Sequence, residues 1–511
     1  MQIDIKILLS WRSFMKNRLL SLLMVLLMTA SAALTSCSES TDNSDTTADT
    51  SNTAVPSATE ETEPAELTAA EQRALIPDNL PEKTYGGRAF IFCVEPGKTY
   101  EILSEELTGE ATNDAVYDRN IRIEDRFDVK LEVVPSENPH NDVKNIVTAG
   151  THDYDVVGFD NYRASVPIMG EVLYNWCDIP NVDLTQPWHN QLANEPATIN
   201  GKLFAINSDL SISTLQYTYG MFFNYKIWND YGITPQNLYD MVFEGSWTVD
   251  KMKSLTDTIW VDTNGDGKHD RDDVHGYSVC LNLNTTDVWL AAFDLETAVI
   301  HDDGTFEINF FNERTVSALE KAIALTYNEA GTYISNDWRD VPKSFSEGKV
   351  AMSQLYFGET TESLTGMEDT YGILPLPKFD EAQQGYYTNA WDQFSVFGVP
   401  LTMAEADKEV TGVIFEALCA ESYKYVFPAY YDQALKSRYS AEPATAEIID
   451  LIMAGRKLDF TFQFGEQFNA LPYMFRQMLY NNSTDIASKY KQSVKIINKG
   501  VERVLGVYID D

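Results

Sequence analysis

The segment Asp262–Asp273 carries oxygen-bearing side chains at the spacing of a calcium-binding loop. It matches the pattern D-x-[DN]-x-D-G, with further acids at positions 9 and 12. Calcium takes about six to eight oxygen ligands. The predicted ligands are Asp262, Asn264, Asp266, the Lys268 carbonyl, Asp270 and Asp273. Gly267 permits the sharp turn that the loop needs at its sixth position.

Two features suggest that this ion would be structural rather than regulatory. Asp273 stands where Glu is usual, so its reach for bidentate coordination is shorter. A helix is expected before the loop, over 248–259, but an extended segment over 274–279 follows it, which makes half an EF-hand. The alternative is an Asp/Asn/Gly surface turn that binds no metal.

Motifs of catalysis are missing. The sequence contains no G-x-S-x-G, H-E-x-x-H, G-x-x-x-x-G-K-[ST] or G-x-G-x-x-G. The chain is therefore predicted not to be an enzyme. With 77 acidic residues, however, a pair of carboxylates for glycoside hydrolysis remains an alternative.

The elements that would position a site alternate in type. Residues 88–94, 129–133 and 154–159 have strand patterns, and the helical pattern over 113–127 separates the first two. This order is typical of an open parallel α/β sheet, which binds ligands at the carboxyl ends of its strands. Asp160 and Asn161 follow the third strand directly and are candidate ligand-binding residues, although both are also common helix caps.

The composition limits the partners. The 511 residues include 38 bases and 77 acids, for a formal net charge of −39. Phosphate binding needs clustered Lys and Arg, so nucleic acid is excluded as a partner, and the charge of the whole chain argues against docking onto anionic lipid. The size suggests two or three domains.

The N-terminus resembles the signal of a bacterial lipoprotein. Lys16 and Arg18 precede an apolar run over 19–34, which ends in Leu-Thr-Ser-Cys at Cys37. The resemblance implies that Cys37 is lipidated after cleavage of residues 1–36, and that the chain is held at the extracytoplasmic face of the membrane. Met15 is an alternative start to Met1. An ordinary signal peptide with an incidental cysteine is the alternative.

The segment that follows has the composition of a flexible tether. Residues 38–72 contain nine Asp or Glu and no Lys, Arg or aromatic residue, so they cannot bury enough apolar surface to offset ordering. The tether is predicted to occupy 37–83.

Four segments together are similar to the sugar-type solute-binding proteins of bacterial ABC importers. They are Asn200–Ile206, Gly220–Trp228, Phe345–Met352 and Tyr371–Lys378. The second is similar to the family's strand-to-helix turn, apolar-apolar-Tyr/Phe-Asn-Lys, and the third is similar to F-x-x-G-K-A-A-M. Their order and spacing, together with the lipoprotein signal, carry the resemblance.

This resemblance implies an α/β fold of two lobes, the type II periplasmic-binding-protein-like fold, with a ligand cleft at the hinge. Lobe 1 would comprise 84–215 and 388–435, and lobe 2 would comprise 220–385 and 436–511. The chain would cross between lobes near 215–220 and again near 386–391.

The resemblance also implies a function: capture of a small solute, a mono- or oligosaccharide, and delivery to an ABC permease by a monomer. A peptide or another polar solute is the alternative ligand. Sugars stack on aromatic rings and bond to carboxylate and amide groups. The candidate ligand-binding residues are Asp160, Asn161, Asp209, Tyr217, Tyr356, Glu359, Trp391 and Asp392.

The cysteines give no firm signal. Beyond Cys37, they are Cys93, Cys177, Cys280 and Cys419. They can form two disulfides in any of three connectivities, or they can all be free thiols, and the sequence does not choose between these alternatives.

Overall fold

The computed structural model describes residues 67–281, 284–301, 305–431 and 443–509, all of which belong to one compact unit, Glu66–Asp511. The predicted signal peptide and Cys37 lie outside the described residues.

The first sheet has four strands in the order β12-β3-β1-β2. Its strands are β1 (Arg88–Val94), β2 (Val129–Pro135), β3 (Val156–Asp160) and β12 (Ser395–Gly398). β1 runs parallel to both of its neighbours, and β12 joins antiparallel beside β3. The three strands and the intervening helix that the sequence predicts are therefore confirmed.

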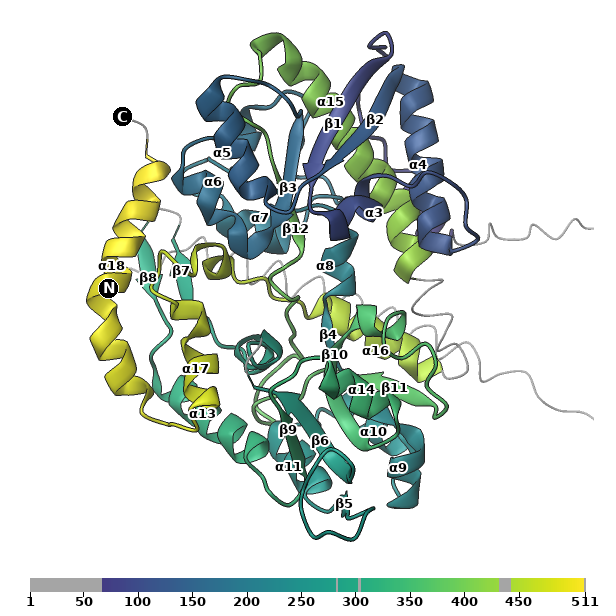
Figure 1. The fold of residues 1–511 in the computed structure, drawn as a ribbon, viewed down its shortest axis with the longest axis vertical. Helices are drawn as coiled ribbons and strands as arrows, with labels where there is room; N and C mark the ends of the chain where they lie inside the picture. The colour runs from purple at the N-terminus through teal and green to yellow at the C-terminus, as the bar shows by residue number, and fades with distance from the viewer. Residues whose placement is uncertain (1–66, 282–283, 302–304, 432–442, 510–511) are drawn as a thin grey trace, which may run out of the picture. The chain divides into compact units, whose positions relative to one another are not determined.

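Helices cover this sheet and connect its strands. They are α3 (Thr99–Ile102), α4 (Ala111–Phe127), α5 (Pro139–Ala149), α6 (Ser165–Met169), α7 (Gln191–Ala197), α8 (Ile212–Gln216) and α15 (Lys408–Glu421). In Figure 1, α4 and α15 lie to one side of β1 and β3, and α5 and α6 lie to the other. A strand buried between two helical layers must be apolar on both faces, as the consecutive buried residues Phe92, Cys93 and Val94 in β1 are.

The second sheet has the strand order β11-β4-β10-β6-β5, and β9 also pairs with β6. Its strands are β4 (Tyr219–Asn224), β5 (Trp260–Val261), β6 (Val274–Cys280), β9 (Thr332–Ser335), β10 (Val350–Tyr356) and β11 (Tyr371–Leu374). Every residue of β4 and β10 is buried, because helices pack around this sheet as well.

The helices of this part of the chain precede and follow its strands. They are α9 (Tyr225–Asp230), α10 (Pro235–Phe243), α11 (Val249–Thr256), α12 (Val288–Ala292), α13 (Glu313–Thr326), α14 (Asp340–Ser346), α16 (Pro443–Ala454) and α17 (Met474–Tyr480). A small separate ribbon pairs β7 (Ala298–Ile300) with β8 (Phe306–Ile308).

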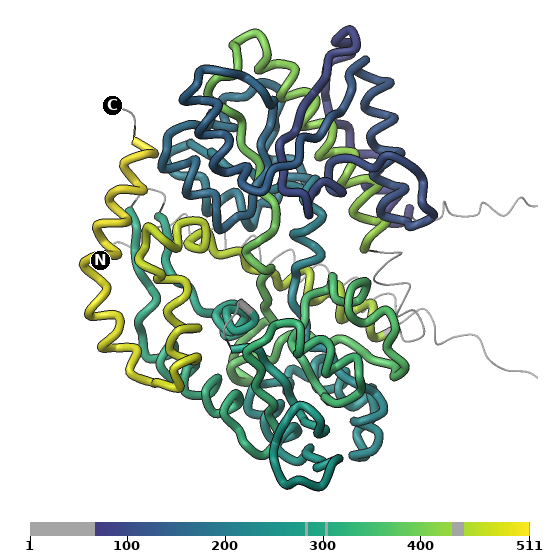
Figure 2. Tube along the Cα trace, in the orientation of Figure 1, coloured from purple at the N-terminus to yellow at the C-terminus, as the bar shows by residue number. Residues whose placement is uncertain are grey.

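The C-terminal part of the chain contacts both halves. α16 packs on β11 and α17 on α13, which belong with the second sheet. The 3₁₀ helix η10 (Phe460–Phe464) packs instead on η2 (Asn161–Arg163), and α18 (Ile486–Val507) packs on α6, which belong with the first. The Cα trace in Figure 2 shows this segment running along the side of both halves. The segment predicted to belong to the second lobe, 436–511, therefore packs on both halves in its described part.

Ordered structure also begins before residue 84. α2 (Ala69–Ala74) starts with a capping box in which Thr68 and Glu71 exchange hydrogen bonds. The Arg73 guanidinium lies 5.4 Å from the ring centroid of Tyr423 and 5.0 Å from that of Phe427. The last part of the predicted tether is therefore a helix packed on the domain, because its apolar and basic residues differ from the acidic stretch before it.

The four described cysteines are free. Cys93, Cys280 and Cys419 are buried and Cys177 is exposed. Within the described ranges, no helix is both long and apolar enough to cross a bilayer.

Candidate functional site

Three of the chain segments that run between the two halves pair with one another through their backbones. The Trp391 N–H donates to the Tyr217 carbonyl at 2.9 Å, and the Tyr219 N–H donates to the Asn389 carbonyl at 3.1 Å. A third segment follows α16, where the Lys457 N–H donates to the Thr388 carbonyl at 2.7 Å. The sequence predicts two crossings here, and the third comes from the C-terminal part of the chain.

The carboxyl ends of strands from both sheets meet at these crossings. The residues that follow β3 are joined to the second crossing, since the Asn161 N–H donates to the Phe394 carbonyl at 2.9 Å and the Tyr162 N–H to the Asp392 carbonyl at 3.0 Å. The end of β10 is joined to the first crossing, since the Phe357 N–H donates to the Thr218 carbonyl at 3.0 Å. The fold thereby places polar loop residues from both sheets around one hinge.

Four aromatic rings pack against one another at the hinge. The Tyr217 ring centroid lies 5.1 Å from Trp391 and 5.5 Å from Tyr356, and Tyr356 lies 5.8 Å from Trp391 and 6.1 Å from Tyr219. Tyr217 and Trp391 remain partly exposed. Three residues that the sequence predicts to bind the ligand, Tyr217, Tyr356 and Trp391, therefore lie together at the hinge.

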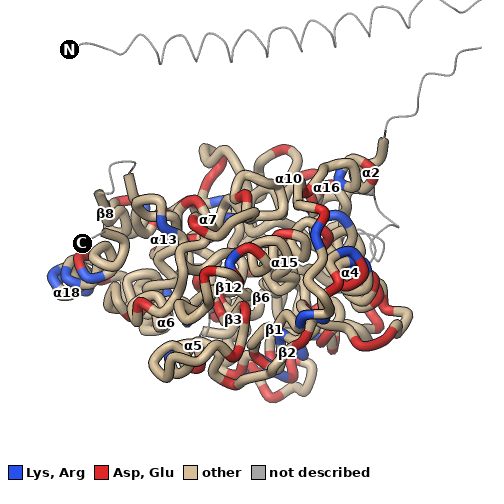
Figure 3. Tube along the Cα trace, turned by 90° about the horizontal axis from the view of Figure 1, so that it is seen from above, with Lys and Arg blue, Asp and Glu red and all other residues tan. Residues whose placement is uncertain are grey.

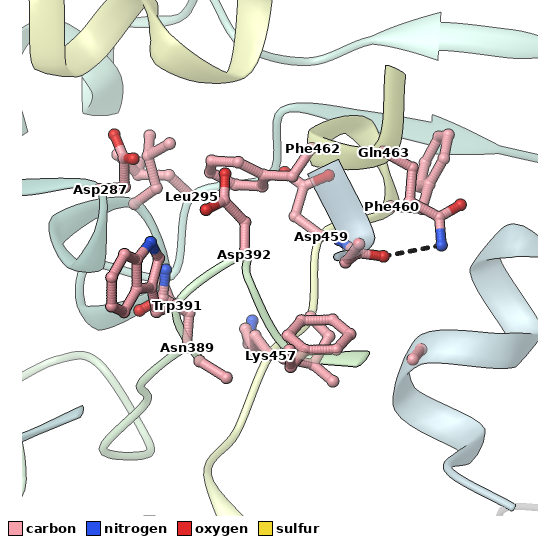
Figure 4. Close-up of a pocket in the computed structure, with 17 residues that line it drawn as sticks. Asp287, Leu295, Asn389, Trp391, Asp392, Lys457, Asp459, Phe460, Phe462 and Gln463 are labelled. Carbon is pink, nitrogen blue, oxygen red and sulfur yellow. Dashed lines mark hydrogen bonds between the residues drawn. The ribbon is translucent and has the colours of Figure 1, made fainter. Parts of the chain in front are cut away.

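A pocket opens beside Trp391. Its empty volume is about 680 Å³, counting the part open to solvent. Figure 4 shows the Asp392 carboxylate near the middle of the pocket, with Asp287 and Trp391 on one side of it and Phe462 on the other. Other lining residues are Asn161, Leu290, Leu295, Asn389, Phe394, Lys457, Asp459, Phe460 and Gln463.

Several buried polar atoms around the hinge have no hydrogen-bond partner among the residues that the structure describes. They are Lys98 Nζ, Asp160 Oδ1, both carboxylate oxygens of Asp287, Glu359 Oε2 and Asn389 Oδ1. Asp160 is 5% exposed, Asp287 1% and Glu359 2%. The only charged contact of Asp287 among the described residues is an ion pair with Arg476 at 3.0 Å. A buried polar atom without a partner costs free energy, so this concentration points to a group that supplies the missing hydrogen bonds.

The electrostatics of these acids follow from their burial. Burial, together with the neighbouring charges of Glu95 and Asp392, raises the pKa of Asp160 to about 8, although Lys98 opposes the rise. Burial likewise raises the pKa of Asp287 to about 8, although Arg476 opposes it. The pKa of Glu359 rises to about 7 for the same reason. Perturbed carboxyl groups gathered in a cleft are typical of a functional site.

Two predicted residues already have protein partners within the cleft. The Tyr473 hydroxyl donates to Asp392 Oδ2 at 3.1 Å, and burial raises the pKa of Asp392. Asn161 Oδ1 accepts from Gln463 Nε2 at 2.8 Å, the bond drawn in Figure 4. Each keeps further hydrogen-bonding capacity for a ligand.

Asp209 is not brought to this site. It lines a separate polar cavity with Asn207, Tyr430 and Arg456, on a loop before α8. Burial raises its pKa to about 7, and the charge of Arg456 opposes that rise. Nearness in sequence to the first crossing thus does not place Asp209 in the pocket beside Trp391, because the chain turns through α8 in between.

Several pocket residues carry no signal in the sequence. Asp287 follows β6 after a short 3₁₀ turn, and Asp459, Phe460, Phe462 and Gln463 come from the segment after the third crossing. The pairing of Thr388 with Arg456 and the packing of η10 on η2 bring that segment to the hinge.

The loop Asp262–Asp273 has a defined turn but does not gather its acids. Gly267 has a φ of 72°, as a sharp turn requires, and Asp262 accepts from the N–H groups of Gly265 and Gly267 at 2.6 and 2.9 Å. Asp273 instead accepts from Trp260 Nε1 and the Thr263 N–H, each at 3.1 Å. Among the described residues, no set of three or more His, Cys, Asp or Glu side chains is arranged to hold a metal. Calcium binding stays a prediction.

Comparison with known proteins identifies the fold. No family model matches the chain, and no curated protein matches it. Its structure is similar to that of the maltose/maltodextrin-binding domain MalE from Bdellovibrio bacteriovorus bound to maltotriose, with a TM-score of 0.51 at 13% identity. The match covers 82% of this chain and 98% of the other. The chain thus has the two-lobe α/β fold of periplasmic binding proteins, as the sequence predicts.

Proposed function

We propose that the protein is an extracytoplasmic solute-binding protein that captures a small carbohydrate at the hinge between its lobes and passes it to an ABC permease. No covalent chemistry is part of this role. The fold supports the binding role, since two lobes that close on a ligand give a transporter two states to distinguish.

One observation carries the carbohydrate assignment: buried, unpartnered polar atoms lie beside packed aromatic rings at the hinge. A sugar has apolar CH faces that can stack on Trp391, and hydroxyls that both donate and accept hydrogen bonds. A carboxyl group that keeps its proton up to about pH 8, such as that of Asp160, can both donate and accept, whereas the Lys98 ammonium, 4.1 Å from the Tyr217 ring centroid, needs an acceptor. A neutral polyol supplies both, whereas a wholly apolar ligand supplies neither.

The test is calorimetric titration of the chain with maltotriose, other neutral mono- and oligosaccharides, and short peptides. Maltotriose comes first because the structural neighbour holds it. Saturable binding of at least one saccharide, with a rise in melting temperature, is the expected result. Binding of peptides alone would overturn the carbohydrate assignment.

The same mixtures distinguish a binding protein from a glycan-processing hydrolase. After prolonged incubation, chromatography should recover every saccharide uncleaved. Accumulation of shorter products, abolished by Asp160→Asn or Asp287→Asn, would replace the binding role with paired-carboxylate hydrolysis.

The proposed membrane anchor is Cys37. A lipid there and the acidic segment after it would hold the binding domain near its permease while letting it reorient. Mass spectrometry of the mature N-terminus should find an acylated cysteine, and Cys37→Ala should release the protein or leave it unprocessed. A mature wild-type N-terminus without an acyl group would refute the lipid anchor, but it would not contradict the proposed ligand-binding function.

A further inference from the structure

Helix α18 is amphipathic, and its inner face holds it on the domain. Ile486, Ile497 and Val504 are buried, and Gly500 lies so close to the Gln467 carbonyl that a Cβ would collide with it. Asp485 caps the helix by accepting from the Ser488 N–H at 3.2 Å. The helix is therefore fixed in rotation, so its outer face is well defined.

The outer face of α18 is basic. Within its 22 residues the helix has five bases and one acid, Glu502, on a chain whose net charge is −39. All five bases are exposed: Lys489, Lys491, Lys495, Lys499 and Arg503. The last four follow one another at intervals of four residues, which places them along one side of a helix opposite the buried face.

These bases are not used inside the protein. None of the five forms an ion pair or a side-chain hydrogen bond with another described residue, whereas Lys83, Lys253 and Lys321 elsewhere on the surface each pair with an acid. Figure 3 shows the bases of α18 gathered at one end of the domain, with red segments spread over the rest. Ile496, on the flank of the stripe, is 53% exposed.

We infer that the outer face of α18 docks onto anionic phospholipid headgroups and orients the domain over the membrane. From Lys491 to Arg503 the stripe is about 18 Å long, at 1.5 Å per residue. A straight, exposed row of cations fits a flat surface in which anionic lipids can gather beneath it. The exposed aliphatic side chain of Ile496 can enter the headgroup layer beside the lysines.

The net charge of the chain does not prevent this contact. Salt screens charges beyond about 8–10 Å at physiological ionic strength, so a bilayer touching α18 responds mainly to the local cations. The acidic faces are repelled, which favours the one orientation in which α18 faces the lipid. The inference rests on the proposed extracytoplasmic membrane location, where the anchor would hold the domain beside such a surface.

The experiment uses the predicted mature chain, 37–511, carrying Cys37→Ser so that no lipid anchors it. This chain keeps the whole compact unit that begins at Glu66. Binding is measured by flotation with vesicles of phosphatidylcholine alone and with vesicles that contain about 30% phosphatidylglycerol, at 150 mM salt. Saccharide titration of the same preparation reports separately on the proposed cleft.

The chain with the wild-type α18 should bind anionic vesicles more tightly than neutral ones. The triple variant Lys491→Glu/Lys495→Glu/Lys499→Glu should bind anionic vesicles at least about tenfold more weakly. The matched control, Lys130→Glu/Lys226→Glu/Lys343→Glu, makes the same charge change at exposed lysines elsewhere. It should retain most of the binding. Equal loss in both triple variants, or no preference of the wild-type surface for anionic vesicles, would overturn the inference even if saccharide binding is intact.

Discussion

The protein buries acidic side chains in two different ways. Glu416 is 1% exposed and is surrounded by donors: Trp188 Nε1 at 2.9 Å, His189 Nε2 at 2.8 Å and the Asp183 N–H at 3.4 Å. Around the hinge, Asp160 and Asp287 are just as buried but leave carboxylate oxygens without a hydrogen bond. Glu101 repeats the first arrangement, since it accepts from the Ser213 N–H and the Ser395 hydroxyl.

The difference separates structural acids from acids kept for a ligand. A fully bonded buried carboxylate stabilises a unique packing arrangement, and an incompletely bonded one costs stability until something binds it. The hinge acids therefore reduce the stability of the ligand-free protein, and the following experiments test that division.

The largest expected effect is on stability at the structural acid. Glu416→Ala leaves the Trp188 and His189 groups buried without an acceptor, so the unfolding free energy should fall by about 3 kcal/mol. Urea unfolding measures the loss. The folded fraction should bind saccharide with unchanged affinity. An unfolding free energy within about 0.5 kcal/mol of wild type would contradict the distinction between a structural acid at Glu416 and the acids at the hinge.

A smaller effect, on affinity alone, is expected at Trp391. Trp391→Ala removes the partly exposed stacking surface and should weaken saccharide binding at least about tenfold, equivalent to roughly 1.4 kcal/mol. Tryptophan fluorescence of the wild-type protein should change on binding. Trp338→Ala is the matched control, because Trp338 is 42% exposed outside the hinge pocket. Were the two variants to bind equally well, the hinge pocket would not be the ligand site.

The pH dependence of stability distinguishes a hinge acid from a structural one. The pKa of Asp160 in the folded protein is about 8, above its ordinary value, so between about pH 4 and pH 8 the folded state holds a proton that the unfolded state has lost. The unfolding free energy must therefore fall as pH rises through this window.

The asparagine in the variant Asp160→Asn cannot ionise, so the unfolding free energy of this variant should not show the decrease that Asp160 causes between about pH 4 and pH 8. In the absence of ligand, we expect the variant to exceed wild type by at least about 1 kcal/mol at pH 8, with a smaller gap at pH 5. Urea unfolding at both pH values measures this. A gap that does not depend on pH would mean that Asp160 is ionised in the folded protein.

The smallest effect is expected at the loop Asp262–Asp273, whose acids already accept backbone N–H groups. If calcium binds there, adding it to chelator-treated protein should raise the melting temperature by about 1–2 °C, and Asp266→Ala should remove the response without changing saccharide affinity. An identical melting temperature with chelator and with calcium would leave the loop as a metal-free turn.

Much of the fold could be predicted because its signals are local. The apolar runs of β1 and β3 and the helical spacing of α4 each lie within one short segment, and the structure confirms them. The placement of Asp160 and Asn161 at the hinge also follows from a local rule, since residues after a parallel strand lie at the binding edge of the sheet. Asp209 has no such rule, and its assignment to the ligand site is not supported by its position.

The sequence by itself determined several strands and helices, among them those over 88–94, 113–127 and 129–133. It also determined the acidic character of the chain, because periodicity and composition depend only on neighbouring residues. The tertiary structure alone decided which residues share a pocket. Asp287 and the segment 457–463 come to the hinge pocket from distant parts of the chain, and the missing partners of Asp160 and Asp287 become visible only when every surrounding group is in place. A hydrogen bond that is not made leaves no pattern in a sequence, since it depends on the positions of all the donors that could have made it.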